Sequence, residues 1–214
     1  MILQKLLKTR NMISKIPKFL QQLFSKSVEF RIKTKEKVIF LTFDDGPVPE
    51  VTNKVLEILR RYNAKATFFC VGDNIRKHPE CYQSLLSEGH SVGNHTMYHS
   101  NGPITKFEDY QTSVEKCEDF CKTNLFRPPY GRITRKQFQF VKSKGYRIIL
   151  WTVISFDYNQ KNTPAICLKN SLKLKAGDII LFHDNPKAER NMLYCLERVL
   201  SFYSKKGFRF ERIV

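Results

Sequence analysis

The residues VIFLTFDDGP, from Val38 to Pro47, decide the fold of this chain. The run 38–41 is continuously apolar, which is typical of a β-strand buried on both faces of a parallel sheet. Two carboxylates, Asp44 and Asp45, follow it, and Gly46 and Pro47 then make a sharp turn. An isolated Asp-Asp-Gly also suits an exposed turn. At a buried strand end, however, two adjacent carboxylates are unfavourable unless a cation or protons offset them.

From this strand onward, apolar runs alternate with helical patterns. Further strands are expected at 66–71, 147–151, 179–182 and 208–210, with a short one at 91–92, and helices at 50–62, 79–88, 106–122, 134–144, 164–172 and 189–204. This alternation predicts βα units, a parallel sheet and a single α/β domain. Ligands of such folds bind at the carboxyl ends of the strands, so the polar residues directly after strands are candidates for an active site.

Two histidines lie four residues apart, at His95 and His99. A helical turn at this point would direct both imidazoles the same way, as one metal ion requires. A pair of histidines alone is more often structural. Together with the surplus carboxylate of Asp45 they form a two-His-one-carboxylate set, which leaves coordination positions open for water and substrate.

Three more residues would complete a hydrolytic site. Arg127 begins the rigid segment Arg-Pro-Pro-Tyr-Gly and could pair with the second carboxylate, Asp44, to keep it ionised. His183 ends a predicted strand and suits a general acid, while Asp157 could orient it and raise its pKa. With Asp44 as the base and a backbone N–H at the oxyanion, these groups predict metal-assisted hydrolysis of an amide or ester.

Five segments, in this order, resemble the polysaccharide deacetylases of the NodB-like type, carbohydrate esterase family four. They are 42–47 (TFDDGP), 95–99 (HTMYH), 127–131 (RPPYG), 151–158 (WTVISFDY) and 181–184 (LFHD), and the resemblance spans about residues 37–212. It implies a distorted (β/α)7 barrel, a divalent metal that is usually zinc, and an N-acetylated glycan as substrate.

The resemblance also implies a role for each site residue. Asp45, His95 and His99 would be the metal ligands. Asp44 would be the base, held by Arg127, and His183 would be the acid, with its pKa tuned by Asp157. The backbone N–H of Tyr130 would bind the oxyanion, and Trp151 and Leu181 would shape the pocket for the acetyl methyl group. The fourth segment departs from the family pattern Val-Asp-x-x-Asp-Trp, because Ile154 replaces the first Asp and Tyr158 replaces Trp. The tuning of His183 would then depend on Asp157 alone.

The net charge is unusual for a chain of 214 residues: 37 Lys and Arg against 20 Asp and Glu give +17. Such a charge attracts polyanions such as nucleic acid, anionic lipid or an acidic envelope polymer, although a Lys-rich solvated surface explains it equally well. The basic residues are scattered and no nucleic-acid recognition motif is present, so nucleic acid is only a minor alternative.

Residues 1–36 lie outside the resemblance and are expected to form a basic N-terminal extension, followed by a catalytic domain at 37–214. Apolar residues recur at nearly helical spacing between Leu3 and Phe24, and Pro17 interrupts the pattern. A basic amphipathic helix of this kind can lie peripherally on an anionic membrane, or it can pack on the domain itself.

The sequence leaves the cellular location open. No apolar stretch is long enough for a transmembrane helix, and the apolar core of a signal peptide is missing after Leu7. The six cysteines form no recognisable disulfide or zinc pattern and are expected to be free, buried thiols in a reducing compartment. These features favour a cytoplasmic or peripherally membrane-associated protein, whereas most relatives of the resembled family act outside the cytoplasm.

Three functions therefore compete. The leading hypothesis is N-deacetylation of an amino-sugar polymer or oligosaccharide, either chitin-like or an envelope glycan such as peptidoglycan. The same site would also serve an O-acetyl esterase acting on a xylan-like polysaccharide. A catalytically silent glycan-binding protein is the third, and it is the least favoured because every expected base, ligand and acid is present.

Overall fold

The computed structural model describes residues 14–17 and 27–214. Within them the strands are β1 (Val38–Asp44), β2 (Ala66–Cys70), β3 (Ser91–Asn94), β4 (Leu125–Phe126), β5 (Arg147–Ile148), β6 (Val153–Ile154), β7 (Ile179–His183) and β8 (Arg209–Phe210). They form one sheet in the order β5-β4-β3-β2-β1-β7-β6, in which every pairing is parallel, and β8 pairs with the start of β1. The predicted α/β class and parallel sheet are confirmed.

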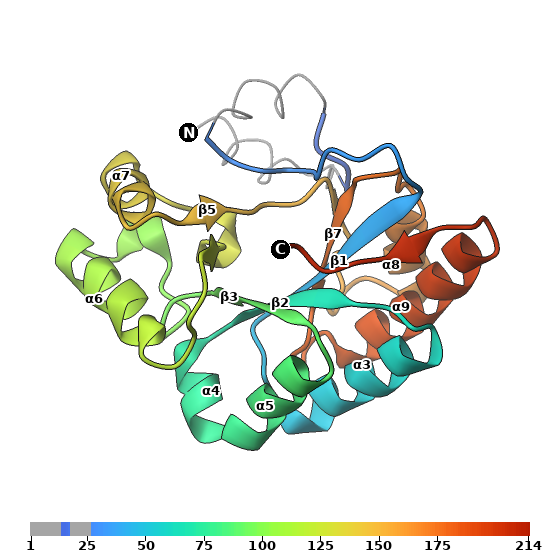
Figure 1. The fold of residues 1–214 in the computed structure, drawn as a ribbon, viewed down its shortest axis with the longest axis horizontal. Coiled ribbons are helices and arrows are strands. Elements are labelled where there is room, and N and C mark those ends of the chain that lie inside the picture. Colours follow the sequence, from blue (N-terminus) through green and yellow to red (C-terminus); the bar gives the residue numbers. More distant parts are fainter. Residues whose placement is uncertain (1–13, 18–26) are drawn as a thin grey trace.

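Helices cover the outer side of this curved sheet (Figure 1). They are α3 (Pro49–Arg61), α4 (Gly72–Lys77), α5 (Pro79–Ser87), α6 (Phe107–Glu118), α7 (Arg135–Ser143), α8 (Pro164–Ser171) and α9 (Glu189–Ser204), with short 3-10 turns at Gly102–Ile104 and Pro129–Gly131. None of the helices in the described part of the chain combines the length and the apolar character needed to cross a membrane.

Strand alternation divides the apolar residues between the two sides of the sheet. In β1, Leu41 and Phe43 belong to the cluster that packs under the helices, whereas Phe40 belongs to a second cluster inside the curve of the sheet. Thr42 and Asp44 alternate with the first set and therefore share the inner side with Phe40. Every residue of β1 is buried, as its continuous apolar run predicts.

The described parts of the N-terminal region pack along the side of the sheet between β5 and β7, as the blue trace in Figure 1 shows. Ile16 donates a backbone hydrogen bond to Thr152, and Glu29 donates one to Ile148. Phe30 is buried in the inner cluster. Residues 14–17 are therefore not helical; the rest of the expected amphipathic segment, 1–13 and 18–26, lies outside the described residues, and its membrane contact stays a prediction.

Most predicted elements are present, with ends shifted by up to four residues. The strand expected at 147–151 ends at Ile148, because the backbone beyond it pairs with Glu29 instead. The short helix α4 and the two-residue strands β4 and β6 were missed. The segment from His95 to His99 is an irregular loop rather than a helical turn, since Thr96 and His99 have positive φ. All six cysteines are free and buried, as expected.

Candidate active site

The carboxyl ends of the strands bring the base and acid candidates side by side. In the register of β1 and β7, Asp44 is directly opposite His183. Both residues alternate with side chains of the outer cluster, so both face the inner side of the sheet. Two residues that lie far apart in sequence therefore become neighbours through one strand pairing, which pattern alone does not reveal.

Asp44 is held by a fully buried arginine. Arg127 Nη1 donates to Asp44 Oδ1 at 2.7 Å and to Thr42 Oγ1 at 2.8 Å. The rest of the guanidinium donates to two backbone carbonyls, those of Ile149 and Leu150. Burial lowers the pKa of the Arg127 guanidinium, and the neighbouring carboxylate of Asp44 offsets part of this effect. The arginine thus supplies a fixed positive partner that holds one carboxylate in a single orientation.

Asp45, His95 and His99 converge on one point. Asp45 Oδ1 lies 3.1 Å from His99 Nε2 and 3.6 Å from His95 Nε2, and one ligand atom from each residue lies within 4.8 Å of the others. Asp45 Oδ1 is buried and accepts no hydrogen bond within the described chain. Burial would raise the pKa of Asp45, but His95 and His99 hold that pKa well below its ordinary value. An ionised, unsatisfied oxygen facing two imidazole nitrogens fits a divalent cation.

The orientation of His95 supports this assignment. Its Nδ1 lies 2.7 Å from the backbone carbonyl oxygen of Arg127. A carbonyl can only accept, so the proton must be on Nδ1 and the lone pair of Nε2 is left facing Asp45. The segment that carries Arg127 therefore positions both Asp44, the candidate base, and His95, a candidate metal ligand.

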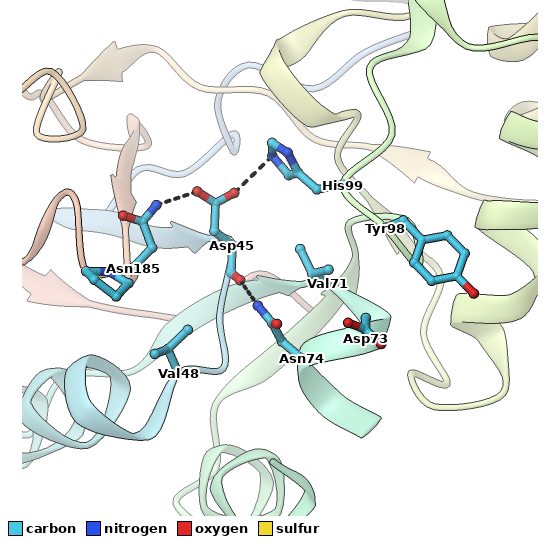
Figure 2. Close-up of a pocket in the computed structure, with 9 residues that line it drawn as sticks. Asp45, Val48, Val71, Asp73, Asn74, Tyr98, His99 and Asn185 are labelled. Carbon is cyan, nitrogen blue, oxygen red and sulfur yellow. Dashed lines mark hydrogen bonds and ion pairs between the residues drawn. The ribbon is translucent and has the colours of Figure 1, made fainter. Parts of the chain in front are cut away.

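Two asparagines that sequence reasoning missed also hold Asp45 (Figure 2). Asn185 Nδ2 donates to Asp45 Oδ2 at 2.6 Å, and Asn74 Nδ2 donates to the Asp45 backbone carbonyl at 2.7 Å. Asn185 follows His183 and Asp184 directly, so its place after a strand could have flagged it. Asn74 lies in the unpredicted helix α4, and no sequence signal pointed to it.

A pocket of about 430 Å³ opens beside these ligands. Its lining is Asp45, Val48, Val71, Asp73, Asn74, Tyr98, His99, Asn185 and Pro186. In Figure 2, Asp45 lies in the middle of this group, between His99 and the two asparagines. The pocket therefore gives a ligand access to the side of the cluster formed by Asp45 and His99.

His183 is paired with Asp157, as the sequence suggested. His183 Nδ1 and backbone N lie 2.8 Å from the two oxygens of Asp157. Burial alone would lower the pKa of His183, but the charge of Asp157 and its hydrogen bond raise that pKa to about 9. Tyr158 packs edge-on against the imidazole, with ring centroids 4.9 Å apart. His183 is therefore protonated at neutral pH and can donate from Nε2.

The residues proposed to bind the substrate occupy different places. Tyr130 packs its exposed ring against His99, with centroids 4.6 Å apart, and has φ of 61°. Trp151 and Leu181 are buried in the inner cluster and do not line the pocket of Figure 2. Trp151 packs on Gly131, where an added Cβ would lie 2.7 Å from the indole. Their contact with an acetyl group stays a prediction.

Backbone strain gathers around these side chains. Of the six residues other than glycine that have positive φ in the described chain, five lie within the site or next to one of its residues: Asp45, Thr96, His99, Tyr130 and Phe156; the sixth, Asn63, follows α3. Such conformations are unfavourable and persist where surrounding structure imposes them, most often at functional sites.

Comparisons with known proteins identify the family and the fold of this chain. The sequence model of the family described as polysaccharide deacetylase matches residues 31–149. A peptidoglycan-N-acetylglucosamine deacetylase of Bacillus cereus is 36% identical over 190 residues, which cover 86% of this chain and 89% of that protein. A chitooligosaccharide deacetylase of Azorhizobium caulinodans is 35% identical over 161 residues, covering 72% of this chain and 77% of the relative.

A solved structure is similar over nearly the whole fold. The Bc1960 peptidoglycan N-acetylglucosamine deacetylase superposes with a TM-score of 0.84 at 28% identity, covering 92% of this chain and 95% of that one. This match confirms the expected (β/α)7-type barrel. By the family match and by its relatives, this chain is a member of the polysaccharide deacetylase family, carbohydrate esterase family four.

Proposed function

We propose that this chain removes N-acetyl groups from an amino-sugar polymer or oligosaccharide with the help of a divalent cation, and that Zn²⁺ is the cation. One observation carries the proposal: the buried oxygen of Asp45 has no hydrogen-bond donor and faces His95 and His99. The paired carboxylate Asp44 and the protonated His183 stand beside it in the strand register. A site built only for glycan binding has no need of this combination.

When bound by Asp45, His95 and His99, the cation would supply Lewis acidity that activates water and polarises the substrate carbonyl. Asp44 accepts the proton of the attacking water, and Arg127 directs that carboxylate through its hydrogen bond.

The remaining steps belong to other residues of the chain. The backbone N–H of Tyr130 donates to the developing oxyanion. His183 then donates its Nε2 proton to the leaving nitrogen as the C–N bond breaks, so the products are acetate and a free amine. Asp157 holds the imidazole in the required orientation through Nδ1.

Exposed aromatic rings around the site suit a glycan. Tyr98, Tyr130 and Tyr158 are 59%, 54% and 42% exposed. Tyr98 lines the pocket, Tyr130 packs on His99 and Tyr158 packs on His183. The apolar faces of sugar rings pack well on such rings, while the hydroxyl groups remain available for hydrogen bonds.

The test measures acetate release from an N-acetylglucosamine oligomer and from acetylated xylan, with bound metal determined on the same preparations. We expect release from the amino-sugar oligomer. Release only from xylan would make the chain an O-acetyl esterase, and release from neither would leave a glycan-binding protein.

Variants assign the roles. Asp44→Ala should keep the metal and lose about 10²–10⁴-fold in kcat, the usual contribution of a general base. His95→Ala should lose the metal. Asp109→Ala, the same change at an exposed position on α6, is the matched control and should change neither. A near-full rate in Asp44→Ala would contradict the assigned base.

A further inference from the structure

Arg132 has a cationic side chain that no acceptor among the described residues binds. Part of its guanidinium is also buried away from water, so water does not fully take the place of an acceptor. Among the described residues, three arginines make no ion pair, hydrogen bond or ring contact through the guanidinium: Arg132, Arg135 and Arg190. Arg135 and Arg190 are exposed. Arg132 is only partly exposed, and its Nε is buried without an acceptor. A buried donor of a charged group that lacks an acceptor is unfavourable, so this position favours an added acceptor.

The position of Arg132 links it to the site. It follows Tyr130, whose ring packs on the metal-ligand candidate His99, and Gly131, which packs on Trp151. Tyr158, whose ring packs on His183, also responds to the charge of Arg132. Burial and the Asp157 carboxylate raise the pKa of Tyr158, and Arg132 acts in the opposite direction, so the guanidinium lies within electrostatic reach of that ring.

No acid of the described chain is available to Arg132 at this rim. Asp157, the acid whose charge also reaches Tyr158, already accepts from His183 through both oxygens and from the backbone N–H of Tyr158. Asp44 is held by Arg127. With these two acids engaged, an anion from outside the chain would satisfy Arg132.

We propose that Arg132 is a specificity-determining residue that binds a carboxylate carried by the glycan, on the acetylated sugar or on its neighbour. The proposal rests on the proposed deacetylase function and names its substrate class: an acidic N-acetylated glycan in preference to a neutral one. A guanidinium presents a planar pair of donors that matches a carboxylate. The net charge of +17, which the reaction itself does not need, would assist the approach of such a polymer.

The experiment compares four substrates of similar length. They are a neutral N-acetylglucosamine oligomer; a peptidoglycan glycan strand freed of its peptides, whose carboxylates are then on muramic acid; the same strand with its carboxylates converted to methylamides; and a hyaluronan oligomer, whose carboxylates are on glucuronic acid. The enzymes are the wild type, Arg132→Gln, Arg132→Lys and the exposed control Arg135→Gln. Arg135→Gln removes the same charge three residues away, so it measures the effect of net charge alone.

For Arg132→Gln we expect kcat/KM on the carboxylate-bearing strand to fall roughly ten- to a hundredfold, mainly through KM, as for the loss of a charge-assisted hydrogen bond. The kcat/KM of Arg132→Gln on the neutral oligomer and on the methylamide strand should differ from that of the wild type by less than about twofold. This result would also show that the variant is folded. Arg132→Lys should lie between Arg132→Gln and the wild type, because it keeps the charge without the planar pair of donors. If Arg132→Gln also loses kcat/KM on hyaluronan, Arg132 recognises any sugar carboxylate. If it loses kcat/KM on the peptidoglycan strand alone, Arg132 recognises the muramyl carboxylate.

Equal losses on neutral and acidic glycans, or equal effects of Arg132→Gln and Arg135→Gln, would overturn the proposal while the deacetylase function stands. Acetate release by the wild type from none of the substrates would instead refute the proposed function. Binding gives a second readout. The single tryptophan, Trp151, packs on Gly131 beside Arg132, so its fluorescence should follow binding of the acidic strand to metal-free protein, with a Kd that is weaker in Arg132→Gln.

Discussion

Replacing Arg127 by methionine should be among the most destabilising single changes that this site allows. The side chain is fully buried and donates to Asp44, Thr42 and the carbonyls of Ile149 and Leu150. Methionine can fill much of the space between the aromatic rings of the inner cluster, but it offers no donor. The substitution therefore isolates the loss of charge and hydrogen bonds from the loss of volume.

The expected magnitude follows from these partners. Leaving a buried charge such as Asp44 without its partner costs about 3–5 kcal/mol. The two carbonyls that lose their donors, those of Ile149 and Leu150, add about 1 kcal/mol each. A loss of about 5 kcal/mol is a large part of an ordinary folding free energy of roughly 5–15 kcal/mol. For a chain of this length it should lower Tm by about 10–20 °C.

The assay is urea and thermal unfolding of metal-free protein in the presence of a chelator, because a bound cation would offset part of the Asp44 charge. A double-mutant cycle with Asp44→Asn provides the internal control. Removing the carboxylate charge should make Arg127→Met/Asp44→Asn more stable than Arg127→Met by about 2 kcal/mol, within the range of roughly 0.5–3 kcal/mol for coupled residues. The reasoning is refuted if Arg127→Met lies within about 1 kcal/mol of the wild type, or if the second change restores no stability.

Two further predictions concern the acid and the metal ligand. Because the pKa of His183 is raised to about 9 mainly by Asp157 acting against burial, the acid form exists below that value and is lost as pH rises through it. Asp157→Asn should therefore move the alkaline limb of the kcat–pH profile about one to three units lower, and an unmoved limb would remove Asp157 from this role. Asn185→Ala leaves Asp45 Oδ2 without its donor, so Zn²⁺ affinity measured by chelator competition should fall about 10–100-fold, with kcat restored at saturating metal. Unchanged affinity would show that Asn185 does not position the ligand.

Much of the site could be predicted because its residues are concentrated in short local segments. Asp44 and Asp45 adjoin a run that is apolar throughout, and such a run is buried wherever it folds. His95 and His99 converge, with ring centroids 5.1 Å apart, although the helical geometry expected for them was wrong. A spacing of four residues allows either a helical turn or a tight loop, so sequence could predict the pair but not its backbone.

Other contacts depended on distances in space that no local pattern encodes. Asn185 reaches Asp45 across 140 positions because β1 and β7 are neighbours in the sheet, and nothing in either segment specifies that pairing. Asn74 lies on a helix too short to produce a clear periodicity. The missing partner of Arg132 is also a property of its surroundings, since an arginine in a sequence carries no sign of whether an acid lies near it.

The sequence by itself determined the fold class and the family and predicted the candidate ligand set, because these depend on residue types at fixed local spacing. Only the tertiary structure showed that two asparagines hold Asp45, and that the buried Nε of Arg132 has no acceptor among the described residues. The physical reason is that charge and hydrogen-bond energies depend on distance and burial, and the pairing order of the strands sets both.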